Sequence, residues 1–242
     1  MNRWRRINQT WCGWPSKPIG LIEMIGGSYL SATPTISYKR LLEGLLNEGI
    51  AIHSWSYIPG FDHQTQANQA WKDFRICKKT LMKRVGELPF SVKLGHSLGC
   101  KLHLISPDKG RNNDGLIAIS FNNFNAKSSI PILGNISKKL EIKPEFKPSP
   151  IETRNIIVNE YIQPRNLLIN FEKDNLDQSQ ELLKSLQKRN DDNSSLLTLS
   201  GGHLTPASAG VRSKFLGEWA DDYSKKKGLL ELIKAIRDWS IF

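Results

Sequence analysis

The sequence predicts an α/β fold in which a mostly parallel central sheet carries helices on both faces. Short apolar runs alternate along the chain with longer segments whose apolar residues recur at helical spacing. Several of these runs are almost continuously apolar, which is typical of parallel strands buried on both faces. This alternation favours parallel strands joined by crossover helices.

The expected elements follow in chain order. Residues 3–18, which carry three tryptophans, predict one or two short edge strands or a cap over the end of the fold. Core strands are expected at 19–25, 50–58, 90–94, 116–121, 167–171 and 196–199. Helices are expected at 36–46, 67–85, 98–105, 150–161, 177–189, 215–223 and 229–239.

Residues 122–165 interrupt the alternation and hold five of the twelve prolines. Ser149 to Glu152 form a capping-box pattern with proline at the first helical position, which predicts the helix at 150–161. An insertion of this size predicts a lid or cap over a site, or else a peripheral packing segment. Because no internal repeat or linker divides the chain, residues 1–242 are expected to form a single domain.

Composition limits the possible classes of protein. A chain of 242 residues with 39% apolar content can bury one large core. The three cysteines lack C-x-x-C spacing, so the sequence indicates neither zinc nor a disulfide framework, and we expect a reducing compartment. No apolar run reaches the length of a membrane span, and the N-terminus lacks a signal-peptide core. We therefore expect a soluble, cytoplasmic protein.

The net charge of +11 raises the possibility of a nucleic-acid partner. The basic residues are spread over groups at 3–6, 138–147, 184–189 and 225–227, and aromatic residues do not interleave with them as in single-strand binders. No nucleic-acid partner is therefore expected. A nucleic-acid binder would instead present one continuous positive face.

The segment Gly95-His96-Ser97-Leu98-Gly99 has the G-x-S-x-G pattern between a predicted strand and a predicted helix. A serine at such a turn is held in a strained conformation with its hydroxyl exposed, and the glycines prevent collisions where the chain reverses. The Leu98 N–H at the start of the helix would supply half of an oxyanion hole. The alternative is a glycine-rich turn with an incidental serine.

Elimination among the five histidines identifies a base for Ser97. On a sheet of this kind the partners follow in the order serine, acid, histidine. The histidines at 53 and 63 precede Ser97, the His96 side chain is expected to point away from it, and the one at 103 packs against its own helix. His203, in a glycine-flanked loop after the last strand, remains as the base. The alternative is a loop histidine bonded to a backbone carbonyl.

The acid is expected in the loop after the strand at 167–171, where the candidates are Glu172, Asp174 and Asp177. Asp177 is better explained as a helix N-cap, with Gln180 completing a capping box. Glu172 follows the strand too closely to reach the imidazole. We therefore predict that Asp174 fixes the tautomer of His203 and stabilises its imidazolium form.

Two further loops are expected near the site. Gly26-Gly27-Ser28 follows the first core strand and could supply a second oxyanion or substrate-binding N–H, or could be a plain tight turn. Residues 61–64, FDHQ, are interpreted as a capped loop. Asp62 or His63 lining the pocket is the alternative.

Several segments resemble the α/β-hydrolases, and in particular a family of cyanobacteria and plastids known only as a domain of unknown function, DUF1350. They are IEMIGGSYLSATPTISYKRLLEGL, FDHQTQANQ, LGHSLGCKLHLI, ISFNNFNAKSSIPIL, EFKPSPIET, LLINFEKDNLDQ and GGHLTP. The resemblance implies the α/β-hydrolase fold, with Ser97 as nucleophile, His203 as base, and Leu98 and Gly27 as oxyanion donors. Two motifs depart from the superfamily pattern: Ile25-Gly26-Gly27 replaces His-Gly, and the loop at 171–174 replaces Gly-x-x-Asp. The second departure leaves the choice of acid open.

The sequence thus predicts an esterase-, lipase- or thioesterase-like serine hydrolase that acts on a small acyl ester, thioester or amide without a cofactor or metal. The alternative is a catalytically silent binding or assembly protein with the same fold. The oligomeric state is left open.

Overall fold

The computed structural model describes residues 4–125, 145–207 and 223–241. Its strands form one eight-stranded sheet in the order β1-β2-β4-β3-β5-β6-β7-β8. The strands from β4 to β8 in this order are parallel, whereas β1 and β2 form an antiparallel hairpin at one edge. The strands are β1 (Trp4–Ile7), β2 (Thr10–Gly13), β3 (Gly20–Ile25), β4 (Ile50–Trp55), β5 (Ser91–His96), β6 (Gly115–Ile119), β7 (Asn166–Phe171) and β8 (Ser195–Leu199). The predicted, mostly parallel sheet is confirmed.

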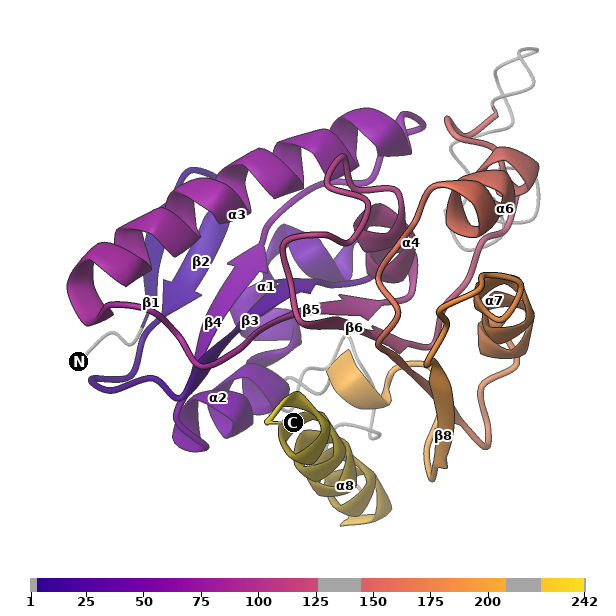
Figure 1. Cartoon of the computed structure of the whole chain (residues 1–242). Coiled ribbons are helices and arrows are strands. Elements are labelled where there is room, and N and C mark those ends of the chain that lie inside the picture. The colour runs from indigo at the N-terminus through magenta and orange to yellow at the C-terminus, as the bar shows by residue number, and fades with distance from the viewer. Residues whose placement is uncertain (1–3, 126–144, 208–222, 242) are drawn as a thin grey trace, which may run out of the picture.

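Helices cover both faces of the sheet (Figure 1). One layer contains α3, α4, α6 and α7, and the other contains α2 and α8. The helices are α1 (Pro34–Ser37), α2 (Lys39–Asn47), α3 (His63–Val85), α4 (Leu98–Leu104), α6 (Pro150–Asn159), α7 (Ser179–Leu186) and α8 (Tyr223–Ser240), with short 3₁₀ turns η1 (Leu30–Ala32) and η3 (Thr205–Ala207).

Alternate residues of each strand pack against opposite layers. In β3, Ile22 and Met24 join the core with α2 and α8, while Leu21 and Ile25 face the layer of α3 and α4. Because both faces are covered, β3, β4 and β6 are entirely buried, which explains why they are mostly apolar in the sequence. The parallel strand β8, at the edge of the sheet, is only partly buried.

Several elements begin or end at residues other than those predicted from the sequence. β4 ends at Trp55, three residues before the predicted end. α3 begins at His63, four residues before the predicted start, because the Asp62 carboxylate accepts hydrogen bonds from the Thr65 N–H and hydroxyl. Asp62 is thus a cap, as predicted, but residues 63 and 64 lie in the helix and not in a loop. The hairpin of β1 and β2 confirms edge strands near the N-terminus. Residues 215–222 of the helix predicted at 215–223 lie outside the described residues, and Tyr223 is the first residue of α8.

The described part of the 122–165 insertion packs against the sheet layer that contains α4. Ser149 and Glu152 form the predicted capping box at the start of α6. Ile157 of α6 packs in a cluster with residues of α4 and α7. The Lys101 ammonium of α4 donates to the Pro148 carbonyl at 2.8 Å, and the backbones of Asp62 and Lys147 form an isolated parallel β-bridge. Residues 126–144 lie outside the described part of the chain, so the lid stays a prediction.

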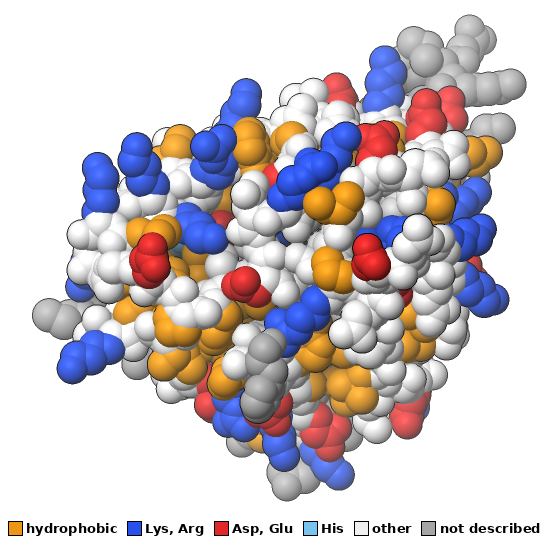
Figure 2. Space-filling model, viewed as in Figure 1, with side chains coloured by type: hydrophobic (Ala, Val, Ile, Leu, Met, Phe, Trp, Pro, Cys, Tyr) orange, Lys and Arg blue, Asp and Glu red, His pale blue; other side chains and the backbone are white. Residues whose placement is uncertain are grey.

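Basic side chains gather along the outer side of α3, as Figure 2 shows in the view of Figure 1. Lys72, Arg75, Lys79 and Lys83 are all exposed and recur at steps of three and four residues, which places them on one helix face. The acidic residue of this helix, Asp73, is buried. A positive row therefore exists on α3, in contrast to the scattered distribution that the sequence suggested.

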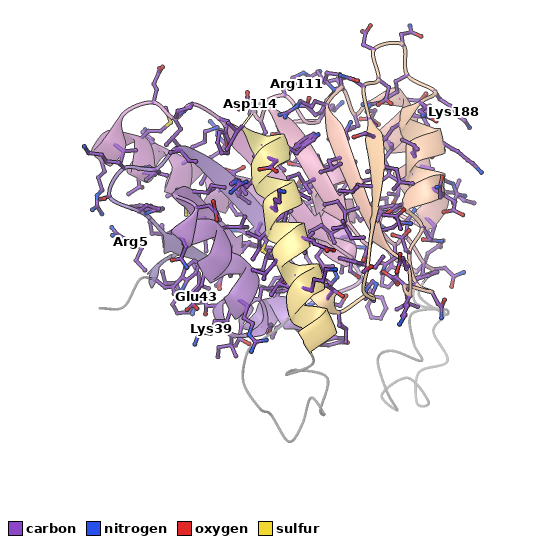
Figure 3. The ribbon with its side chains drawn as sticks, turned by 90° about the horizontal axis from the view of Figure 1, so that it is seen from below. Arg5, Lys39, Glu43, Arg111, Asp114 and Lys188 are labelled. Atoms are coloured by element: carbon purple, nitrogen blue, oxygen red, sulfur yellow. The ribbon has the colours of Figure 1, made fainter. Side chains whose placement is uncertain are left out.

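The carboxyl ends of the parallel strands meet at one edge of the sheet. In Figure 3, Arg111 and Asp114, which precede β6, lie at the upper edge, whereas Lys39 at the start of α2 lies near the lower one. The strands thus run towards the lower edge, where loops follow β3, β5, β6, β7 and β8. Among the described residues, no helix is both long and apolar enough to cross a bilayer.

Candidate active site

Ser97 lies at a sharp turn between β5 and α4. Its backbone adopts φ 54° and ψ −122°, a combination that side-chain-bearing residues rarely adopt. The flanking glycines permit the turn. A Cβ on Gly99 would lie 1.9 Å from the Ile25 carbonyl oxygen, and one on Gly95 would lie 2.5 Å from Cys100 Cα. The chain therefore reverses only because these two positions lack side chains.

A continuous chain of hydrogen bonds connects Ser97, His203 and Asp174. His203 Nε2 lies 3.2 Å from Ser97 Oγ, and His203 Nδ1 lies 2.9 and 3.1 Å from the two Asp174 oxygens. The Asp174 side chain is fully buried, and that of His203 is 17% exposed. The structure therefore brings together the three side chains that the sequence singled out, although His203 follows Ser97 by 106 residues.

The environment of Asp174 favours its ionised form. Burial opposes ionisation, but hydrogen bonds from the His203 ring and from the Leu176 N–H outweigh it and lower the pKa of Asp174. The other two acid candidates lie in different environments. The Asp177 carboxylate accepts from the N–H and hydroxyl of Ser179 at the start of α7, and burial raises its pKa. The exposed Glu172 pairs with Ser200.

His96 does not point away from the site, as the sequence reasoning expected. Its Nε2 lies 2.9 Å from the His203 carbonyl oxygen, and its Nδ1 lies 2.8 Å from the Tyr38 hydroxyl. The reason is topological. β5 is central in the sheet, and its last side chain enters the space between the loops that follow β3 and β8.

The loop after β3 also differs from the expectation in one respect. The Gly27 N–H donates to the Tyr38 hydroxyl at 2.7 Å, so in this conformation it is not free to bind a substrate oxygen. The next N–H, that of Ser28, donates no hydrogen bond within the described residues. Within the predicted triplet Gly26-Gly27-Ser28, Tyr38 therefore engages the Gly27 N–H and leaves the Ser28 N–H available.

Asn122 is a site residue that sequence reasoning missed. Its side-chain amide donates to Ser97 Oγ at 2.8 Å. It follows β6, the strand next to β5, and so reaches the same edge of the sheet as Ser97. The Asn123 N–H donates to the Gln178 side chain at 2.6 Å, which holds this loop against the start of α7. A polar residue just after a strand adjacent to the elbow strand is the signal that could have found it.

Residues of the described chain offer no cluster of three or more His, Cys, Asp and Glu side chains that could hold a metal ion. Cys12, Cys77 and Cys100 are buried free thiols.

Residues 3–223 match the family described as "Protein of unknown function (DUF1350)". The chain belongs to this family. A comparison with curated protein sequences gives no match.

Solved structures similar to this member of the DUF1350 family are α/β-hydrolases. Carboxyl esterase 2 from the fungus Tuber melanosporum matches with a TM-score of 0.64 at 12% identity, covering 96% of this chain and 82% of the esterase. The fluorophosphonate-binding serine hydrolase FphF of Staphylococcus aureus gives a TM-score of 0.57 at 13% identity, with coverage of 96% and 91%. The S-formylglutathione hydrolase of the same organism gives 0.56 at 17% identity, with coverage of 96% and 90%. The DUF1350 chain thus has the α/β-hydrolase fold.

Proposed function

We propose that the protein is a serine hydrolase that cleaves a small acyl ester, thioester or amide. The observation that carries this proposal is the hydrogen-bonded chain from Asp174 through His203 to Ser97 at the strained turn after β5. A serine hydroxyl is a poor nucleophile unless a base removes its proton, and this arrangement supplies both the base and the group that orients it. Similarity in fold to esterases and other serine hydrolases supports the same reaction class.

In the proposed reaction, Ser97 Oγ attacks the substrate carbonyl while His203 Nε2 takes its proton. Asp174 keeps the proton on His203 Nδ1, so that Nε2 is free to act as the base, and its negative charge stabilises the imidazolium. His203 then protonates the leaving group, and a water molecule, deprotonated by the same imidazole, releases the acyl group from Ser97.

The oxyanion that forms on the carbonyl needs hydrogen-bond donors that are already in place. We assign this role to the backbone N–H groups of Leu98 and Ser28. The Asn122 amide is a third donor beside the reacting atoms, since it already contacts Ser97 Oγ. Because Asn122 donates to Oγ, the hydroxyl proton of Ser97 is directed towards His203 Nε2.

The test is covalent labelling combined with turnover. A fluorophosphonate probe should label the parent protein at Ser97, and a panel of p-nitrophenyl acyl esters should be hydrolysed. Ser97→Ala should abolish labelling and reduce turnover by about 10⁴-fold or more. If the folded parent protein resists labelling, the catalytically silent binding or assembly protein becomes the better description. If Ser97→Ala keeps the parent's turnover, the assignment of the nucleophile is wrong.

The positive row on α3 favours a second candidate function, electrostatic binding of a nucleic acid. Fluorescence anisotropy with a labelled DNA duplex tests it. Binding of the duplex should weaken steeply as the salt concentration rises, and replacing Lys72, Lys79 and Lys83 by Ala should abolish it. The matched control replaces the exposed lysines Lys184, Lys188 and Lys234, which lie on or beside α7 and α8, by Ala, and should leave binding of the duplex unchanged. Equal affinity of the two triple variants would reject a role for α3.

A further inference from the structure

His96, the residue before the candidate nucleophile, links two loops that both reach the site. On one side, its Nδ1 lies 2.8 Å from the Tyr38 hydroxyl, which in turn accepts the Gly27 N–H at 2.7 Å. On the other side, its Nε2 lies 2.9 Å from the backbone carbonyl of His203. Three hydrogen bonds thus connect the loop after β3 with the loop that carries the candidate base.

The chemistry of the partners determines the direction of each of these bonds. The His203 carbonyl can only accept, so His96 Nε2 must carry the proton. In a neutral imidazole the other nitrogen is then an acceptor, and the Tyr38 hydroxyl must donate to it. The hydroxyl oxygen keeps a lone pair for the Gly27 N–H. Every donor in the chain therefore meets an acceptor, and with a neutral His96 ring no other arrangement of protons satisfies all three bonds.

Because the chain of hydrogen bonds is buried, the loss of any one bond is costly. Tyr38 is 0% exposed and His96 is 1% exposed, so water cannot replace a lost partner at either residue. Burial, reinforced by the neighbouring His203, lowers the pKa of His96 to about 3, which keeps its ring neutral. The ring centroids of His96 and His203 also lie 5.1 Å apart, so that a shift of one ring would disturb the other.

We propose that Tyr38 and His96 are positioning residues that hold the loop of the base and the loop after β3 at a fixed separation. The proposal rests on the proposed serine hydrolase function. Neither residue touches a reacting atom. They act instead through the backbone of His203, whose ring must stay within hydrogen-bond reach of Ser97, and through Gly27, whose neighbour Ser28 is the assigned oxyanion donor. A displacement of about 1 Å at such a site can cost on the order of 100-fold in rate.

The decisive variant is Tyr38→Phe, which removes one hydroxyl and keeps the ring. We expect kcat for a p-nitrophenyl ester to fall about 10- to 100-fold while KM changes little, because catalytic geometry is lost rather than substrate contact. Tyr161→Phe is the matched control. Tyr161 is also a buried tyrosine, whose hydroxyl lies 2.8 Å from the Asn166 side-chain oxygen on the layer away from Tyr38. It should lose similar stability and keep its kcat.

A second pair of variants tests His96 itself. His96→Gln offers an acceptor and a donor on one side chain and should retain at least about 10-fold more kcat than His96→Met, which offers neither. Stability against urea is measured for each variant, and kcat is expressed per folded molecule. The inference is overturned if Tyr38→Phe matches the Tyr161→Phe control in kcat, or if His96→Gln and His96→Met are equally active.

A readout that does not depend on hydrolysis separates this inference from the proposed function. In ¹⁵N-histidine NMR spectra of the parent protein, His96 should remain neutral at pH 6 with its proton on Nε2, and Tyr38→Phe should shift its Nδ1 resonance. A protein that shows these signals but no esterase activity would reject the hydrolase while retaining the hydrogen-bond chain. A His96 protonated on Nδ1 would reject the chain itself, whatever the activity.

Discussion

Four buried histidines should make the protein unstable in mild acid. Burial lowers the pKa of His53, His63, His96 and His103 to about 3 in the folded chain, against 6.5 for an exposed histidine. His53 shows the structural reason clearly. Its Nε2 accepts the Trp14 indole N–H at 3.0 Å, which a protonated ring cannot do.

The direction in which stability changes with pH follows from proton binding. Between pH 6.5 and pH 3 the unfolded chain binds protons at these four positions and the folded chain does not, so stability falls as the pH falls through this window. At pH 5 each histidine lies about 1.5 pH units below 6.5, which corresponds to about 2 kcal/mol. Together the four cost about 8 kcal/mol, comparable with the whole stability of a typical domain. Glu23 and Asp177, whose pKa values burial raises, act in the opposite sense and reduce the total.

Urea unfolding followed by tryptophan fluorescence at pH 7, 6 and 5 measures this loss. The matched variant is His53→Gln, whose side-chain oxygen can accept the Trp14 N–H but does not titrate. Its unfolding free energy should fall by about 2 kcal/mol less than that of the parent between pH 7 and pH 5. If the parent and His53→Gln lose the same stability, or if neither loses any, the buried histidines do not control the response to acid.

Three further predictions concern single residues. Asp174→Asn should lower kcat about 10⁴-fold because His203 loses its orienting carboxylate, while Glu172→Gln should remain within a few-fold of the parent in the same ester assay. Gly99→Ala should lower the free energy of unfolding, measured in urea, by about 3 kcal/mol or more, because its Cβ would lie 1.9 Å from the Ile25 carbonyl oxygen. Gly60→Ala, with no atom nearer than 3.8 Å, should change the free energy of unfolding little. Burial lowers the pKa of Lys101 from 10.5 to about 8, so between pH 7 and pH 11 the parent should gain about 3 kcal/mol relative to Lys101→Met in the same unfolding experiment. If the difference in unfolding free energy between the parent and Lys101→Met stays the same over this pH range, burial does not lower the pKa of Lys101.

The candidate triad could be read from the sequence because local patterns and chain order constrain it. Ser97 lies within a glycine pattern that only a tight turn can accommodate, and the order of strands leaves His203 as the one histidine in a loop beyond the last strand. Asp174 was separated from Asp177 because a carboxylate just before a helix satisfies the free N–H groups there. These inferences need only the chain itself and the geometry of parallel strands.

The remaining features depend on contacts between distant segments, which no local pattern encodes. The sequence suggests that His96 points away, because at a tight turn of this kind the side chain next to the serine is expected on the opposite side. Its partners, Tyr38 and the carbonyl of His203, lie 58 and 107 residues away in the chain. Asn122 reaches Ser97 only because β6 pairs with β5.

The sequence by itself determined the α/β architecture and the three residues of the candidate triad, because apolar periodicity, glycine spacing and chain order are properties of local segments. The tertiary structure alone decided that Gly27 is engaged by Tyr38, that His96 links two loops, and that Asn122 contacts the candidate nucleophile. The physical reason is that a hydrogen bond between loops depends on distances and directions that arise only after the strands have paired in register.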